Sequence, residues 1–217
     1  MRGRVYLVGS GQDGVLAEVA RRAVRDLGKA KPRVAVTYAP VAGDAKGLRF
    51  MSQRMPRLFP GAVLETLEGD RAVVDRADLV FVSGGDPVLG AKVLRDSGAA
   101  GWLREASSRG VPVMGVSAGA IVLGAFWADW PEDDDPGLDH TELLECTGVV
   151  PRHVFDTHDE DDGWGELRTV AKLLEMRRLH ETTRLTGIPT GGALIYPASG
   201  GPADEPEVVG NPPFRLR

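Results

Sequence analysis

The chain has 217 residues, of which 42% are hydrophobic and 26% are charged, and its formal net charge is −5. This composition excludes a disordered or collagen-like chain. The mild negative charge and the lack of a basic cluster argue against a nucleic-acid-binding protein, because contacts with phosphate groups need a basic face.

The length fits one domain, residues 1–217, with a single well-filled core. Cys146 is the only cysteine, which excludes an intrachain disulfide and a cysteine-based metal site. The sequence has neither a signal-peptide pattern nor a run of about 18 apolar residues, the length that a membrane helix needs. We therefore expect a cytoplasmic protein that binds neither nucleic acid nor membrane and needs no metal or other cofactor. The sequence leaves both a monomer and a homodimer open.

The first half of the sequence alternates short apolar segments with helical patterns. Strands are expected at residues 5–8, 34–36, 62–67, 79–82 and 111–116. Helices are expected after the first strand, up to residue 58, and over residues 91–109. Continuous apolar strands that alternate with amphipathic helices predict an α/β fold, in which helices cover both faces of a mostly parallel sheet.

The second half is less regular. Residues 128–140 are rich in acids and break the pattern, so a loop is expected there. The expected elements that follow are a strand at 149–155, a helix at 164–178, and a hairpin formed by 193–197 and 207–209. We expect these elements to extend the same sheet.

Residues 115–119 (Gly-Val-Ser-Ala-Gly) carry the strongest functional signal. They follow an apolar strand and open a segment of small and apolar residues, which is the setting of a nucleophile elbow. In an elbow, a strained turn projects the hydroxyl, here that of Ser117, above the sheet, and the flanking glycines let the backbone pass without a clash. The alternative is an ordinary turn in which Ser117 caps a helix.

Residues 83–87 (Ser-Gly-Gly-Asp-Pro) end the strand before that one. Neighbouring strands of a parallel sheet end in one crevice. The backbone N–H groups of Gly85 and Ala118 are therefore candidates for an oxyanion hole. The alternative is a tight turn before a helix that begins at Pro87.

A serine nucleophile needs a base, and the sequence has four histidines. His158 is expected at the end of a strand, where the catalytic groups of such sheets gather, whereas His153 lies inside that strand. His140 lies next to the acidic loop, and His180 is explained most simply as a residue at a helix C-terminus. We therefore expect His158 to be the base.

Three segments occur in a recognisable order: 82–86 (Val-Ser-Gly-Gly-Asp), 113–120 (Val-Met-Gly-Val-Ser-Ala-Gly-Ala) and 155–158 (Phe-Asp-Thr-His). Together they resemble the serine peptidase family of aspartyl dipeptidase (peptidase E) and cyanophycinase. The resemblance implies a single-domain fold like that of class I glutamine amidotransferases, with serine in place of their cysteine. It also implies that Ser117 is the nucleophile and His158 the base, and that Gly85 and Ala118 supply the oxyanion hole.

The resemblance leaves the acid of the triad open. In the dipeptidase branch the acid lies in the loop after the nucleophile, where Glu132 occupies a corresponding place. In the cyanophycinase branch it lies nearer the C-terminus, in a Glu-Gly or Glu-Asn turn, and Thr190 stands at that position here. This departure favours Glu132 as the residue that holds the imidazole tautomer. The competing acids are Asp129, Asp133, Asp134 and Asp156.

Dipeptidase relatives read an N-terminal aspartate with an arginine in a Gly-Glu-x-Arg setting. Residues 165–168 (Gly-Glu-Leu-Arg) resemble that motif, which implies that Arg168 binds substrate. Residues 159–162 are all acidic, however, and Asp159 among them would repel an acidic substrate. A preference for basic or free-amine ends is therefore as reasonable as Asp-X specificity.

We expect a serine exopeptidase that hydrolyses short peptides, dipeptidase-like with Asp-X as one candidate substrate, through a Ser-His-Glu triad and an acyl-enzyme. The alternatives are a carboxypeptidase or cyanophycinase-like hydrolase of the same family, and a non-catalytic binding protein. An α/β-hydrolase esterase would place its histidine close to the C-terminus, and a glutamine amidotransferase would have cysteine at the elbow. The G-x-G-x-x-G pattern of residues 9–14 is by itself a weak sign of nucleotide binding.

Overall fold

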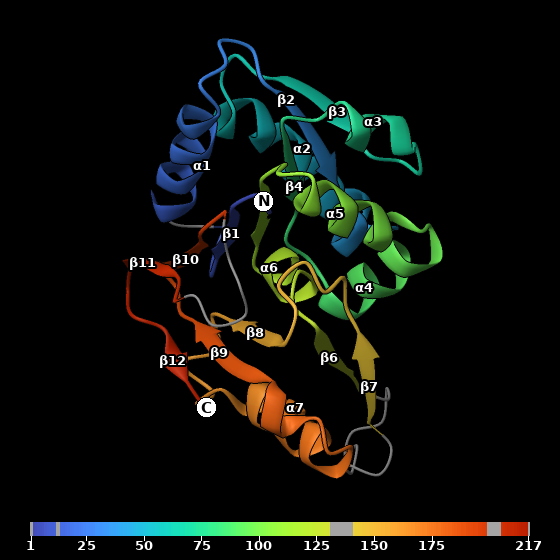
Figure 1. Cartoon of the computed structure of the whole chain (residues 1–217), viewed down its shortest axis with the longest axis vertical. Coiled ribbons are helices and arrows are strands. Elements are labelled where there is room, and N and C mark those ends of the chain that lie inside the picture. The colour runs from blue at the N-terminus through green and yellow to red at the C-terminus, as the bar shows by residue number, and fades with distance from the viewer. Residues whose placement is uncertain (1, 12–13, 131–140, 199–204, 217) are drawn as a thin grey trace.

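A mostly parallel sheet runs through the centre of the molecule (Figure 1). The computed structural model describes residues 2–11, 14–130, 141–198 and 205–216, and within these residues the sheet has seven strands in the order β11-β10-β1-β5-β4-β2-β3. The strands are β1 (Val5–Val8), β2 (Arg33–Thr37), β3 (Val63–Thr66), β4 (Leu79–Val82), β5 (Val113–Val116), β10 (Gly192–Tyr196) and β11 (Glu207–Gly210). Strands β1, β5, β4, β2 and β3 are parallel, whereas β10 is antiparallel to both of its neighbours. The predicted fold class is confirmed.

Helices cover both faces of this sheet. They are α1 (Gly14–Leu27), α2 (Ala45–Leu58), α3 (Arg71–Asp75), α4 (Pro87–Asp96), α5 (Ala99–Ser108) and α6 (Ala118–Val122). In β1, Tyr6 and Val8 pack with α1 and α2, whereas Val5 and Leu7 face the layer formed by α3 to α6. Because both faces are covered, β1, β4 and β5 are buried at every residue, which explains their uninterrupted apolar sequences.

The single helix expected over residues 91–109 is in fact two helices. Helix α4 ends at Asp96 and α5 begins at Ala99. Between them Gly98 has a φ of +77°, a left-handed conformation that glycine adopts without a steric penalty and that interrupts a helix. The apolar periodicity continues across the break, which is why the pattern alone does not predict it.

Much of the second half forms two further sheets, so the expectation of one continuous sheet is wrong. Strands β8 (His153–Thr157), β9 (Arg184–Ile188) and β12 (Phe214–Arg215) form a three-stranded sheet, and β6 (Phe126–Asp129) pairs with β7 (Glu142–Glu145). Only the expected hairpin, β10 with β11, joins the main sheet. An apolar segment predicts a strand, but its hydrogen-bonding partner depends on the rest of the chain.

Helix α7 (Gly165–Met176) packs on these smaller sheets through a separate apolar cluster that includes Trp127, Leu167 and Leu185. Figure 1 places α7 and the smaller sheets at the end of the molecule opposite β2 and β3. Short 3-10 turns lie at Ala39–Val41 and His180–Thr182. In the part of the chain that the structure describes, each helix is too short or too polar to span a bilayer.

Candidate active site

Ser117 lies on a strained turn between β5 and α6. Its φ and ψ are 52° and −127°, and a positive φ is uncommon for a residue that carries a side chain. Its N–H donates to the carbonyl of Val8 in β1 at 2.9 Å, and its carbonyl accepts from the N–H of Ala120 at 2.7 Å. Strain of this kind costs about 1–3 kcal/mol and persists where the surrounding structure enforces it. The turn has the geometry of a nucleophile elbow.

The two glycines that flank Ser117 allow the close packing on which this turn depends. A Cβ on Gly119 would overlap the carbonyl oxygen of Val82 at the end of β4. A Cβ on Gly115 would overlap the carbonyl of Gly119. Helix α6 therefore approaches the strand ends more closely than any side chain would permit.

His158 lies directly after β8 and faces the serine. Its Nε2 is 2.9 Å from the Oγ of Ser117. This distance suits a serine hydroxyl that donates to an unprotonated Nε2, which is the arrangement of a general base with its nucleophile. The N–H of His158 donates to the carbonyl of Ile188 in β9 at 2.9 Å, and its φ is +49°. The backbone of the smaller sheet thus fixes the base beside a nucleophile that the main sheet carries.

The turn after β4 brings Gly85 beside the nucleophile. Its φ is +144°, and a Cβ there would overlap the carbonyl of Pro40. A Cβ on the preceding Gly84 would lie 3.3 Å from the Cβ of Ser117, so the two turns are in contact. Within the described residues, the N–H groups of Gly85 and Ala118 donate to no other group. These two donors suit an oxyanion hole, in which a developing negative charge accepts hydrogen bonds from backbone N–H groups.

Two clefts share Ser117, His158 and Gly85 in their walls. The larger cleft has a volume of about 490 Å³ and is also lined by Phe50, Arg54 and Thr190, among others. The second, which we call the acidic cleft, has a volume of about 180 Å³ and is also lined by Asp156, Asp159 and Glu166. Among the described residues, the larger cleft contains one acid, Asp44, and one arginine, whereas the acidic cleft contains three acids, and the reacting groups lie where the two clefts meet.

Sequence reasoning missed Arg54 in the larger cleft. The residue comes from α2, its guanidinium donates to the carbonyl of Gly11, and it lies 5.0 Å from the ring centroid of Phe50. No motif around residue 54 indicates a functional role. Only the packing of α2 beside the elbow places this cation near the nucleophile.

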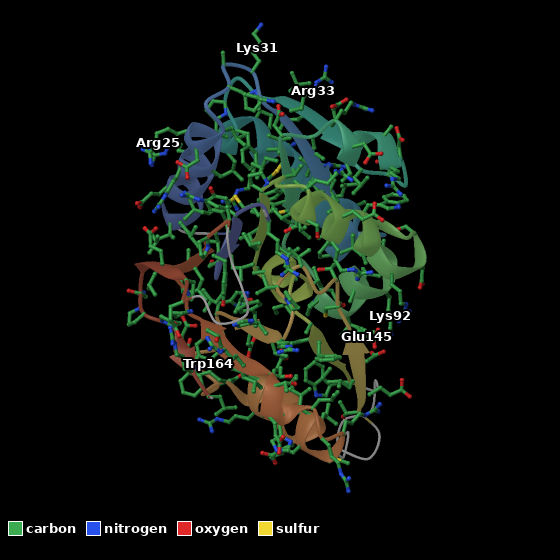
Figure 2. The ribbon with its side chains drawn as sticks, in the orientation of Figure 1. Arg25, Lys31, Arg33, Lys92, Glu145 and Trp164 are labelled. Atoms are coloured by element: carbon green, nitrogen blue, oxygen red, sulfur yellow. The ribbon has the colours of Figure 1, made fainter. Side chains whose placement is uncertain are left out.

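The acids proposed for the triad have different surroundings. Glu132, Asp133 and Asp134 lie outside the described residues, so Glu132 stays a prediction. Asp129 ends β6 and forms an ion pair with Lys92 of α4 at 2.6 Å; the lysine is labelled in Figure 2. Asp156 lies in β8 with its side chain in the acidic cleft.

Glu160 is an acid near His158 that the sequence analysis did not propose for the triad. Its Oε1 accepts a hydrogen bond from the N–H of Thr190 at 3.0 Å. Partial burial raises the pKa of Glu160. The N–H of Glu160 itself, the hydroxyl and N–H of Thr190, and the charge of His158 together outweigh this rise, so the net pKa is lowered. The carboxylate of Glu160 is thus fixed by Thr190, which lies 30 residues further along the chain. Its position two residues after His158 was the available signal.

The two residues predicted to bind substrate have different placements. Asp159 lines the acidic cleft, and its role in binding substrate stays a prediction. Arg168 is exposed and is absent from the described walls of both clefts. Its Nε donates to the carbonyl of Gly163 at 3.0 Å, and its guanidinium lies 5.5 Å from the ring centroid of Phe214. The structure therefore offers no contact between Arg168 and the reacting groups.

The strained elbow, the imidazole within hydrogen-bonding distance and the paired N–H groups serve one kind of chemistry, the attack of an activated hydroxyl on a carbonyl carbon. They define the class as serine hydrolases of α/β fold. The model of Peptidase family S51 matches residues 5–199. The chain belongs to this family and is a serine peptidase, which confirms the resemblance to the peptidase E family.

Two solved structures share the fold. One is described as a peptidase from an acI-B1 Actinobacterium; it is 23% identical with a TM-score of 0.71, and the match covers 100% of this chain and 94% of the other. The second is described as a candidate peptidase E protein from Listeria monocytogenes EGD-e; it is 13% identical with a TM-score of 0.61, and the match covers 100% of both chains. No match was found among curated proteins.

Proposed function

We propose that this protein is an exopeptidase that hydrolyses short peptides through an acyl-enzyme formed on Ser117. The observation that carries this proposal is the 2.9 Å distance between the Oγ of Ser117 and the Nε2 of His158, on an elbow beside two available N–H groups. The two clefts, of about 490 and 180 Å³, suit the ends of a short peptide better than a folded protein chain.

The proposed reaction has two halves. In the first, the Oγ of Ser117 attacks the peptide carbonyl while Nε2 of His158 takes the hydroxyl proton. The oxyanion accepts from the N–H groups of Gly85 and Ala118, and one such donor contributes about 3–4 kcal/mol. His158 then donates the proton to the leaving amine as the C–N bond breaks. In the second half, His158 takes a proton from water as that water attacks the ester carbon. His158 then returns the proton to Oγ as the C–Oγ bond breaks and the carboxylate product leaves.

The third member of the catalytic group has two candidates. Glu132 follows from the resemblance to the dipeptidase branch. Glu160 is favoured by its hydrogen bond to Thr190 and by the charge interaction with His158. Either carboxylate would hold the imidazole tautomer and stabilise its protonated form. Parallel measurements on Glu132→Gln and Glu160→Gln distinguish the two candidates, because only replacement of the residue that fulfils this role should lower kcat.

The experiment that tests the proposal is hydrolysis of a dipeptide panel with Asp-X, Arg-X and neutral ends. The native chain should cleave at least one member, and Ser117→Ala should cleave none. Ser52→Ala is a matched control, because this exposed serine of α2 donates to the carbonyl of Arg49 and belongs to neither cleft. Blocked C-terminal amides in the same panel separate dipeptidase from carboxypeptidase action.

A fluorophosphonate probe supplies a test that does not depend on the substrate. It should label the native chain and the Ser52→Ala control but not Ser117→Ala. Folded native protein that cleaves no peptide and resists the probe would contradict the proposed function and favour a binding role. We also propose a cytoplasmic location, which agrees with a single cysteine that cannot form an intrachain disulfide.

A further inference from the structure

The acidic cleft contains a carboxylate that the proposed reaction does not use. Asp156 is 1% exposed, and its side chain lines the cleft beside Ser117. Its Oδ1 accepts from the N–H of Thr157 at 2.7 Å, and the N–H of Leu167 also lowers the pKa of the carboxyl. Its Oδ2 is buried, and no described group meets it with hydrogen-bond geometry. A buried acceptor without a partner is costly, about 1–3 kcal/mol, and therefore calls for an explanation.

Two more acids face the same space. The Oδ2 of Asp159 is also buried and lacks a partner within the described part of the chain, and Glu166 at the start of α7 lines the cleft as well. These carboxyl groups interact with one another: burial, together with the charges of Asp159 and Glu166, raises the pKa of Asp156 to about 8 against the lowering effect of nearby N–H groups. Partial burial and the charges of neighbouring acids raise the pKa of Glu166 too.

Among the described residues neither Lys nor Arg lines the acidic cleft, and His158 is the basic side chain in its wall. The described acids and histidines also form no group arranged to hold a metal ion. A cluster of carboxyl groups that repel one another gains most from a cation that several of them bind together. The volume of about 180 Å³ suits one small organic cation.

We propose that the acidic cleft binds a positively charged nitrogen group of the substrate, with Asp156, Asp159 and Glu166 as its hydrogen-bond acceptors. The proposal deepens the proposed function and rests on it, because it assigns the charge of the residue that lies next to the scissile bond. The cation has two sources: the α-ammonium of an unblocked peptide or the side chain of a basic residue. An acidic side chain is excluded from the cleft by repulsion.

Kinetics with four substrates, which combine Ala or Arg as the first residue with a free or acetylated N-terminus, distinguishes the two sources of the cation. The substrates are Ala-Ala, Arg-Ala, acetyl-Ala-Ala and acetyl-Arg-Ala. If the cleft binds the α-ammonium, acetylation should lower kcat/KM at least about tenfold for both residues, the value of one charged hydrogen bond. If it binds the side chain, Arg should raise kcat/KM by a similar factor in both backgrounds.

The same four substrates are measured with Asp159→Asn and Glu166→Gln. Each variant should lower the ratio of kcat/KM for the cationic substrate to kcat/KM for acetyl-Ala-Ala about tenfold, because only the cationic substrate loses a charged hydrogen bond. Asp161→Asn is the matched control, because this exposed acid belongs to the same loop but to neither cleft. An unchanged preference in both cleft variants would overturn the proposal.

A binding measurement keeps this inference separate from the proposed function. Propylammonium and propylguanidinium are titrated into the native chain and followed by NMR, with uncharged 1-propanol as the control. At least one cation should bind, and about tenfold more weakly to Glu166→Gln, whereas propanol should not bind. Binding without any peptide hydrolysis would refute the peptidase proposal alone. Hydrolysis without cation binding, or equal binding by the variant, would refute the cation site alone.

Discussion

Replacing Asp156 by asparagine should remove a pH-dependent loss of stability. The pKa of this carboxyl is raised from 3.8 to about 8, chiefly by burial and then by Asp159 and Glu166, against the lowering effect of the N–H groups of Thr157 and Leu167. The native state therefore holds a proton that the unfolded chain has already released at neutral pH. A group of this kind stabilises the fold below its unfolded pKa, and that contribution is lost as the pH rises through the folded pKa.

The magnitude follows from the two pKa values. The unfolded chain is almost fully ionised at pH 6, so each pH unit from 6 towards 8 costs the native state up to about 1.4 kcal/mol. The total loss between pH 6 and pH 9 is about 3 kcal/mol, an upper value because relaxation around the charge reduces it. The amide introduced by Asp156→Asn would keep the acceptor for Thr157 and carry no charge. The variant should therefore gain about 3 kcal/mol on the native chain over this range.

Urea unfolding at several pH values between 6 and 9 measures this difference, because the contributions of all other groups cancel between the two proteins. In thermal unfolding the same effect corresponds to about 6–12 °C for a chain of this size. Asp161→Asn, which changes an exposed acid nearby, should follow the native curve. Parallel curves for the native chain and Asp156→Asn would show that this carboxyl is ionised in the native state and would refute the reasoning.

Three further substitutions test the site. Gly85→Ala should lower kcat about 100-fold or more, because the added Cβ would overlap the carbonyl of Pro40 and displace an oxyanion donor. Steady-state kinetics measures this effect and circular dichroism checks the fold; an unchanged kcat would contradict the assignment of the oxyanion hole. Arg54→Ala should raise KM about tenfold for dipeptides with a free C-terminal carboxylate, because this arginine lies in the larger cleft and we expect it to bind that carboxylate. The KM values of the matching amides should not change, and an equal rise of KM in both series would exclude the contact. Glu160→Gln should lower kcat about 10-fold to 100-fold with little change in KM, and should alter the pH profile of kcat, because the His158 imidazolium loses a charge partner. If kcat and its pH profile match those of the native chain, Glu132 is left as the acid of the triad.

Local features of the sequence determined a large part of this protein. The Gly-Val-Ser-Ala-Gly turn at residues 115–119 requires a sharp strand-to-helix connection, because its glycines tolerate backbone contacts that exclude a Cβ. Uninterrupted apolar strands such as β1 and β5 predict burial on both faces and thus a parallel sheet. These signals depend on neighbouring residues, and for this reason the fold class and the family follow from the sequence.

The tertiary structure decided what depends on distant segments. Strand β8, which leads into His158, pairs with β9 in a separate sheet, although the sequence predicted that it would extend the main sheet. Glu160 meets the N–H of Thr190 from a distant point of the chain, and the motif-like Arg168 lies against Phe214. Burial and electrostatic coupling arise only when separate elements pack together. For this reason the raised pKa of Asp156 and the acidic cleft follow from the folded chain and not from the sequence.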